Sequence, residues 1–146
     1  MKKLAIGLLL SMVSVSAFAN TPTYKTLADE KATFELCESA SNALNNETLY
    51  VTPALEIFEP YLGRSDDEIE LAEVNNQVYL AQLLDTKIGN PVSTIHLDTE
   101  KEMKDSFLIH RFLLKRERYM LGILCKFYQP RENGHWKLAN FSIFTP

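Results

Sequence analysis

The sequence predicts an α+β domain in which helices come first and pack on an antiparallel sheet of about four strands. Hydrophobic residues recur at three- and four-residue spacing in the first part of the chain, as they do on one face of a helix. From Val92 onward the spacing changes to two, which is the period of a half-buried strand. Turn residues divide this second part into short segments, a pattern typical of antiparallel hairpins. Because the two periods occupy separate parts of the chain, they favour segregated helices and strands over alternating βαβ units.

Residues 1–19 have the pattern of a bacterial secretory signal peptide. Two lysines precede an apolar stretch over residues 4–15, and Ala17-Phe18-Ala19 supplies the small residues of a cleavage site. The apolar stretch is shorter than the roughly 20 residues of a spanning helix, and no later segment is apolar enough to span a bilayer. We therefore expect cleavage after Ala19, a periplasmic or secreted protein without a membrane span, and one domain over residues 20–146.

The first helix is predicted over residues 24–44. Thr26 and Asp29 match a variant of the N-terminal capping box. The apolar residues of this segment fall near one face at helical spacing: Leu27, Phe34, Cys37, Ala40 and Leu44. We expect this face to be buried against the sheet.

Two more helices are expected before the sheet. A short one begins at Thr52, with Pro53 at its first helical position. A longer one covers residues 65–85 and opens on the acidic run Asp66-Asp67-Glu68. This run fits either a metal site or a capping box of Ser65 and Glu68, with acids in the first turn that complement the helix dipole. We favour the cap. The residues expected to be buried on this helix are Leu71, Val74, Val78 and Ala81, with Ile69, Leu80 and Leu84 flanking them.

Four strands are expected in the second part of the chain. Their predicted ranges are 92–98, 106–114, 119–128 and 136–144. A polar turn over residues 99–104, a charged turn over residues 115–118 and a hairpin loop over residues 130–134 connect them. The third strand is apolar on both faces, so we expect it near the middle of the sheet.

The sequence contains two cysteines, Cys37 and Cys125. In an oxidising compartment an isolated pair is most simply a disulfide, which would join the first helix to the third strand. The alternative is two buried free thiols. No histidine stands at a metal-ligand spacing from either cysteine, so we expect no metal site.

Charge is distributed unevenly along the chain. Residues 20–100 hold 15 acidic and 4 basic residues, whereas residues 101–146 hold 4 acidic and 9 basic residues. Either acidic helices lie on a basic sheet and the fields partly cancel, or the basic part offers a surface to an anionic partner. The net charge of −4 and the expected export argue against nucleic acid as that partner.

The order of elements resembles the nuclear-transport-factor-two-like superfamily. The features that carry the resemblance are the helices followed by a long apolar strand, a Gly-containing hairpin and a last strand that begins at Trp136. Members are cone-shaped α+β domains in which a strongly curved sheet wraps around helices, and small secreted bacterial members are common. The resemblance covers about residues 24–144. It implies a curved sheet, a pocket between the first helix, the third helix and the concave sheet face, and a homodimer formed through the sheet.

Three residues are candidate ligand-binding positions: His110, Tyr119 and Trp136. His110 stands among apolar neighbours on a predicted strand, where a titratable side chain is costly to bury unless it is hydrogen-bonded. It is either a catalytic or ligand-binding residue or a histidine satisfied within the sheet. Trp136 fits a partner anchor or a core aromatic. The charged turn supplies a candidate partner surface: Lys115, Arg116 and Arg118.

The sequence holds no recognisable catalytic constellation. It lacks a Gly-x-Ser-x-Gly elbow, a phosphate loop and a His-Glu-x-x-His motif. The polar strand residues that could face inward are His96, Asp98, His110, Tyr119 and Asn140, and no pair of them has a spacing that demands catalysis. We therefore assign no catalytic residue, no metal ligand and no cofactor.

The sequence alone favours an exported, non-enzymatic module that binds a small apolar ligand or a protein. Two other functions stay open. One is an immunity or inhibitor protein that neutralises an exported hydrolase, which suits the small size and the uneven charge. The other is an isomerase or dehydratase, which the resemblance allows and which would need an acid or base in the pocket.

Overall fold

The computed structural model describes residues 24–63, 66–85 and 88–146. The predicted signal peptide and Ser65, the expected N-cap of the third helix, lie outside the described residues. The elements run in the order α1 (Glu30–Leu44), α2 (Thr52–Phe58), the 3-10 helix η1 (Glu59–Tyr61), α3 (Asp66–Asp85), β1 (Pro91–Glu102), β2 (Phe107–Arg116), β3 (Met120–Tyr128) and β4 (Lys137–Phe144). Within these ranges no helix has the length and apolar character needed to cross a membrane.

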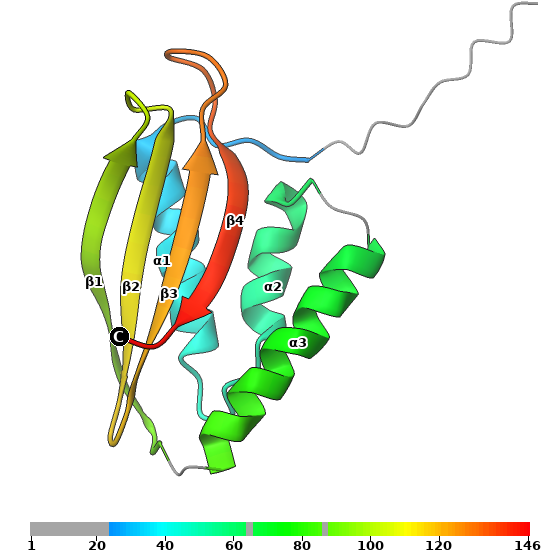
Figure 1. Cartoon of the computed structure of the whole chain (residues 1–146), viewed down its shortest axis with the longest axis vertical. Coiled ribbons are helices and arrows are strands. Elements are labelled where there is room, and N and C mark those ends of the chain that lie inside the picture. The colour runs from blue at the N-terminus through cyan, green and yellow to red at the C-terminus, as the bar shows by residue number, and fades with distance from the viewer. Residues whose placement is uncertain (1–23, 64–65, 86–87) are drawn as a thin grey trace, which may run out of the picture.

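The four strands form one antiparallel sheet in the order β1-β2-β3-β4. Helix α1 lies against one face of the sheet, which we call the inner face, and contacts β1, β2 and β3 (Figure 1). Helix α2 packs on α1, and Phe58 of α2 stacks on Phe141 of β4 with ring centroids 4.7 Å apart. Helix α3 lies beyond α2, away from the sheet (Figure 1). Helices therefore precede the sheet and cover one face of it, which confirms the predicted α+β class.

Alternating residues of the two central strands build the inner face. The buried apolar residues on this face of β2 and β3 are Leu108, Phe112, Leu114, Leu121, Ile123 and Phe127. They form one core with the buried side of α1 and with α2. Each fully buried side chain of this size contributes about 1.5–3 kcal/mol of transfer free energy. This alternation follows directly from the period-two pattern of the sequence.

A disulfide joins Cys37 of α1 to Cys125 of β3, with the two Cα atoms 6.0 Å apart. The predicted pairing is confirmed. The bridge links positions 88 residues apart, so it restricts the unfolded chain strongly. The chain-entropy model allows roughly 4–5 kcal/mol for a loop of this length, as an upper estimate.

Helix α1 begins six residues later than predicted. Asp29 is its N-cap, and the Asp29 carboxylate accepts a 2.8 Å hydrogen bond from the backbone N–H of Ala32. The segment before the cap is extended, because Leu27 exchanges two backbone hydrogen bonds with Trp136, of 2.9 and 2.8 Å. Leu27 is buried as expected, but through this bridge rather than through the helix.

Strand β1 is longer than predicted and changes face part-way along. Its ladder with β2 continues to Glu102, so residues 99–102, expected as a turn, are strand. A register shift between His96 and Asp98 leaves His96 on the inner face and puts Asp98 on the outer face, where it pairs with Arg111 at 2.9 Å. A bulge residue reverses the alternation of a strand. Of these two candidates for the inner face, His96 lies on it and Asp98 does not.

Helix α3 exposes the face that its sequence predicted to be buried. The exposed residues are Leu71, Val74, Val78 and Ala81. On another face, Leu80 is fully buried and the Gln77 side-chain oxygen accepts a 2.9 Å hydrogen bond from the backbone N–H of Val51. Thr52 also donates to the Glu73 carboxylate. The polar contacts with the start of α2, together with Leu80 and the partly buried Tyr79 and Leu83 that pack on the core, therefore orient α3, and the predicted stripe does not.

Candidate functional site

A cavity opens at the end of the sheet where α1 begins, between the β1–β2 turn and the β3–β4 loop, at the top of Figure 1. Its volume is about 550 Å³. We call it the hairpin-end cavity, and its lining residues are Glu30, Lys101, Lys104, Asp105, Ser106, Gln129, Glu132, Asn133 and Trp136. The volume lies within the range of small-molecule sites, but the lining is more polar than is usual for them.

The hairpin-end cavity contains an ion pair between two elements. Glu30 stands in the first turn of α1, and its carboxylate lies 2.7 Å from Nζ of Lys101 on β1. The hydrogen bond with Glu30, together with its negative charge, raises the pKa of Lys101 above its ordinary value. Both side chains are about half exposed, so their charges are also available to a ligand. The pair joins the helix layer to the edge strand at the mouth of the cavity.

The β1–β2 turn that lines the cavity has an unfavourable backbone. Met103, Lys104 and Asp105 have φ angles of 49°, 54° and 65°, all in the left-handed region. The turn is closed by a 3.2 Å hydrogen bond from the Ser106 N–H to the Met103 carbonyl. Tight hairpin turns of this kind usually carry Asn or Gly, and other residues cost of order 1 kcal/mol each there. Such local strain is found most often at functional sites.

The β3–β4 loop on the other side of the cavity is braced by hydrogen bonds. The Gln129 side-chain amide donates to the Gly134 carbonyl at 2.6 Å, and the Gly134 N–H donates to the Arg131 carbonyl at 2.9 Å. The backbone N–H of Gln129 donates to the carbonyl of Ser106 at 2.9 Å, which ties this loop to the neighbouring turn. The two walls are therefore held in a fixed relation before a ligand enters.

Trp136 is the one sequence-predicted ligand-binding candidate that lines the hairpin-end cavity. It is 3% exposed, and its backbone pairs with Leu27 just before α1. It therefore belongs to the core under the cavity and also forms part of the cavity wall. Both interpretations considered for this residue, core aromatic and binding residue, are compatible with its position.

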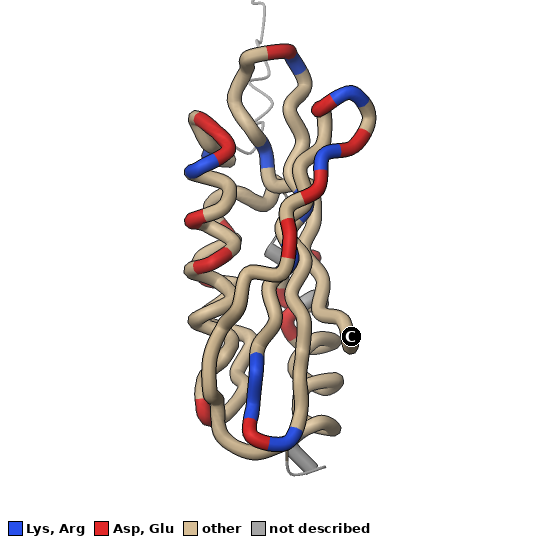
Figure 2. Tube along the Cα trace, turned by 90° about the vertical axis from the view of Figure 1, so that its left-hand side faces the viewer, with Lys and Arg blue, Asp and Glu red and all other residues tan. Residues whose placement is uncertain are grey.

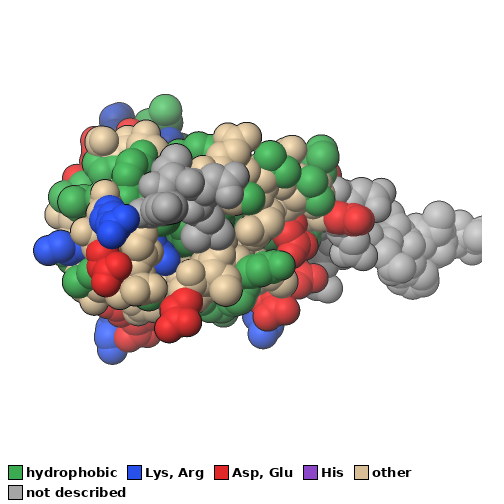
Figure 3. Space-filling view, turned by 90° about the horizontal axis from the view of Figure 1, so that it is seen from below, with side chains coloured by type: hydrophobic (Ala, Val, Ile, Leu, Met, Phe, Trp, Pro, Cys, Tyr) green, Lys and Arg blue, Asp and Glu red, His purple; other side chains and the backbone are tan. Residues whose placement is uncertain are grey.

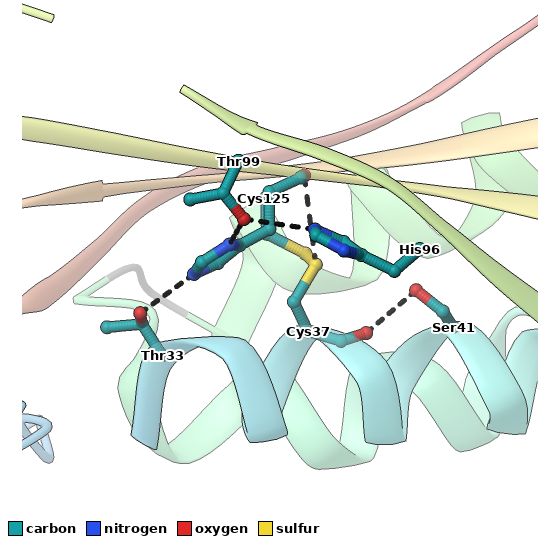
Figure 4. The surroundings of a disulfide bond; sticks show 7 residues. Thr33, Cys37, Ser41, His96, Thr99 and Cys125 are labelled. Atoms are coloured by element: carbon teal, nitrogen blue, oxygen red, sulfur yellow. Dashed lines mark hydrogen bonds between the residues drawn. A yellow bond between two sulfur atoms is a disulfide. The ribbon is translucent and has the colours of Figure 1, made fainter. Parts of the chain in front are cut away.

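His110 is buried between α1 and the inner face of the sheet and is not among the residues that line the cavity. Its side chain is 2% exposed. Its Nε2 lies 2.9 Å from the Thr33 hydroxyl of α1, and its Nδ1 lies 2.8 Å from the Thr99 hydroxyl of β1. Thr99 in turn lies 3.0 Å from Nε2 of His96. Figure 4 shows this chain of side chains beside the disulfide.

The hydrogen bonds of Thr33 determine how His110 is protonated. The Thr33 hydroxyl donates its proton to the Glu30 carbonyl at 2.6 Å, so it accepts from Nε2–H of His110. Nδ1 of His110 then accepts from the Thr99 hydroxyl, which accepts from Nε2–H of His96. Burial, and to a smaller extent the nearby His96, lowers the pKa of His110 to about 4, against the opposing charge of Glu30. His110 is therefore neutral at pH 7 and fully hydrogen-bonded.

The remaining candidates lie at the opposite end of the sheet, around the β2–β3 turn. Figure 2 shows the basic residues of this turn at the bottom of the molecule and charges of both signs in the loops at the top. Tyr119, Lys115 and Arg118 are exposed there. Arg116 is 3% exposed, so it adds little to a partner surface. The structure does not bring these residues together with His110 or Trp136.

Arg116 instead holds two loops against the end of the sheet. Its Nε donates to the Gly89 carbonyl at 3.0 Å, and its Nη1 donates to the Asn46 carbonyl at 2.9 Å and to the Asn45 side-chain oxygen at 3.2 Å. Burial lowers the pKa of Arg116, and the charge of Glu117 opposes this effect. Nη2 is buried, and no described residue forms a hydrogen bond with it. The side chain therefore has a structural role at this end of the fold.

No protein-family model, curated protein or solved structure matches this chain.

The chemistry available in the hairpin-end cavity is recognition of charge and hydrogen-bonding groups. Lys101 and Lys104 supply positive charge, and Glu30, Asp105 and Glu132 supply negative charge. Among the described residues no group of three or more His, Cys, Asp or Glu side chains is arranged to hold a metal ion. Most of this lining was not predicted from the sequence, although the dense charges of residues 101–105 in an expected turn were a signal that could have identified it.

Proposed function

We propose that this protein is an exported, non-enzymatic binding module and that the hairpin-end cavity is its ligand site. The observation that carries the proposal is a cavity of about 550 Å³ whose lining holds both lysines and carboxylates. Its walls are joined by the ion pair of Glu30 and Lys101 and by the hydrogen bond between Gln129 and Ser106. Preorganised walls reduce the entropy that binding must otherwise overcome.

The lining favours a small polar ligand with charges of both signs over an apolar one. A carboxylate would be recognised by Lys101 and Lys104, and an ammonium group by Asp105 or Glu132. Amino acids and short peptides have this combination. Trp136 provides a limited apolar surface for the rest of the ligand.

The placement of His110 argues against a catalytic role for this residue. A general acid or base must come within hydrogen-bond reach of the substrate. Both ring nitrogens of His110 are engaged by threonine hydroxyls, and its side chain is 2% exposed. The isomerase or dehydratase alternative therefore lacks its best candidate residue at the cavity.

The proposed export rests on the leader-like sequence and is supported by the disulfide of Cys37 and Cys125, which is typical of oxidising compartments. The order of helices and sheet agrees with the nuclear-transport-factor-two-like superfamily, which the sequence resembles and which includes binding proteins. We retain membership of that superfamily as part of the proposal.

Thermal unfolding in the presence of candidate ligands tests the proposal. The probes are the common amino acids, a set of dipeptides, and simple amines and carboxylates as single-charge comparators. A ligand at 100 times its dissociation constant adds about 2.7 kcal/mol to the unfolding free energy, which shifts the midpoint by several degrees. We expect zwitterions to stabilise the protein more than either comparator.

Two variants locate the binding site. Glu30→Gln and Lys101→Gln are expected to abolish the ligand-induced shift, whereas Lys115→Gln, which alters an exposed lysine at the opposite end of the sheet, retains it. Native mass spectrometry of the oxidised protein reports any ligand retained from the host. The proposal fails if no probe raises the midpoint and the purified protein carries no ligand.

A further inference from the structure

Helix α3 carries an apolar strip on the surface, which we call the α3 stripe: Leu71, Val74, Val78 and Ala81. The side chains of Leu71, Val74 and Val78 are 62%, 53% and 55% exposed. Figure 3 shows hydrophobic side chains among the charged ones on the lower face of the molecule. A helix normally turns its apolar stripe toward protein, so a stripe that the chain itself leaves uncovered marks an interaction surface.

The orientation that exposes the α3 stripe is held by specific contacts. Gln77 accepts from the Val51 N–H at 2.9 Å, the Glu73 carboxylate accepts from the Thr52 hydroxyl, and Leu80 is fully buried. Burying the stripe against the same chain would break these contacts. The stripe is thus available to a second molecule without any rearrangement of α3.

The spacing of the α3 stripe is the same in both directions along the helix. Its successive steps are 3, 4 and 3 residues. When two α3 helices pack antiparallel about a twofold axis near Asn76, Val74 faces Val78 of the second copy and Leu71 faces Ala81 of the second copy. A twofold interface requires a surface that is complementary to itself. The stripe meets this requirement at all four positions.

The charges of α3 favour the same antiparallel arrangement. Five of its six acidic residues lie within residues 66–73, and α3 contains no lysine or arginine. Parallel pairing would place acid against acid over residues 66–73, whereas antiparallel pairing places that acidic half of each helix against residues 79–85 of the other, where Asp85 is the one charged residue. Antiparallel packing also opposes the two helix dipoles. Charge and apolar spacing therefore select one orientation.

We propose that two copies of this protein associate through the α3 stripe as an antiparallel helix pair. The interface is small, because it is confined to one helix from each copy, and it falls near or below the roughly 1,200 Å² at which standard interfaces begin. The dimer is therefore reversible and dependent on concentration. This arrangement leaves the hairpin-end cavity open in both copies, so it is independent of the proposed ligand.

The outer face of the sheet, through which the family resemblance implies dimerisation, is less suited to self-association. Arg111 forms ion pairs of 2.9 and 2.8 Å with Asp98 and Glu100, and Lys126 forms one of 3.0 Å with Glu102. Covering these charges would remove them from water without supplying new partners, which is costly. The α3 stripe carries no such penalty.

Sedimentation of the oxidised protein over a range of concentrations measures self-association directly. We expect the average mass to rise from monomer toward dimer. We expect V74E/V78E to remain monomeric, because each carboxylate introduced on one helix would face a carboxylate introduced on the helix of the second copy. Ile95→Glu is the matched control, since Ile95 is a comparably exposed hydrophobic residue, 44% exposed, on the outer face of the sheet. Circular dichroism of each variant checks that the fold is retained.

Charge exchange then tests whether α3 meets α3. V74E/V78E and V74K/V78K are each expected to be monomeric, and an equimolar mixture is expected to form a heterodimer. A photo-crosslinking residue at position 81 should label the peptide that contains Leu71 of the second copy. The inference is overturned if wild type stays monomeric at every concentration, if I95E alone dissociates the dimer, or if the mixture does not associate. Recovery of a basic protein bound to the stripe in place of a second copy would also overturn it.

Discussion

The hydroxyl of Thr99 on β1 lies 2.8 Å from Nδ1 of His110 on β2, and the bulge in β1 makes this contact possible. The register shift after His96 returns Thr99 to the inner face, directly opposite His110. If the ladder ran on from His96 without this shift, Asp98 would stand opposite His110, and Thr99 would face outward and could not contact Nδ1. A local irregularity of the edge strand thus satisfies a buried histidine and keeps it neutral.

Stability should fall as the pH is lowered from 6.5 toward 4, because His110 must stay neutral in the folded protein. Its pKa is lowered from 6.5 to about 4, so the unfolded chain binds more protons in this interval and protonation favours unfolding. The contribution of neutral His110 to the free energy of unfolding is about 3 kcal/mol. It is fully present above pH 6.5 and is lost by about pH 4. Urea unfolding at several pH values measures it. His110→Gln removes the titrating group, and the prediction is contradicted if this variant shows the same pH dependence as wild type.

Thr33→Val should destabilise the protein by about 1–3 kcal/mol, because it leaves the Nε2–H of buried His110 without an acceptor. The substitution preserves side-chain volume, so packing changes little. Thr94→Val serves as control, since Thr94 lies on the inner face of the sheet, which α1 covers, and is only partly buried. Equal denaturation midpoints for the two variants would show that the hydrogen bond contributes nothing.

Arg116→Met should destabilise the end of the sheet by about 2–4 kcal/mol. The change removes three hydrogen bonds of 2.9–3.2 Å and leaves the carbonyls of Gly89 and Asn46 without these donors. Arg118→Met alters an exposed arginine in the same turn and should change stability by less than about 0.5 kcal/mol. Chemical denaturation compares the two. Hydrogen exchange should locate the loss at the two loops that Arg116 holds, and an effect confined elsewhere would argue against this role.

Gly122→Ala should loosen the C-terminal end of β4. A Cβ at position 122 would overlap the Phe144 ring, which lies over this glycine. The ring must move or the strands must separate, at a cost of roughly 1–3 kcal/mol. The double variant Gly122→Ala/Phe144→Ala relieves the clash. Its loss of unfolding free energy should therefore be smaller than the sum of the losses of the two single variants. Additive behaviour in a double-mutant cycle would contradict the contact.

The periodicity of the sequence was sufficient to predict the buried core of the sheet. It was insufficient to predict where the strands end. Leu108, Phe112 and Leu114 are buried at the period of two that was expected from Val92 onward, because the sequence period and the strand period coincide. The strand ends depend on how far a ladder continues, which neighbouring strands decide. Residues 99–102 were expected as a turn because they are polar, yet they pair with β2. The cavity was missed for the same reason, since its lining comes from three separate loops and strand ends.

Local patterns along the chain were enough to predict the α+β order, the pairing of Cys37 with Cys125 and the buried stripes of α1 and the central strands. These features depend on period and on residue chemistry, which are local or nearly so. The tertiary structure alone decided three other features. These are the face that α3 exposes, the register shift in β1, and the ion pair of Glu30 and Lys101 at the cavity. Each of these depends on hydrogen bonds or ion pairs between segments far apart in the chain, and no local pattern records such contacts. The hydrogen bonds at Thr52 and Val51, together with the burial of Leu80, orient α3 and leave exposed the stripe through which we propose that two copies meet.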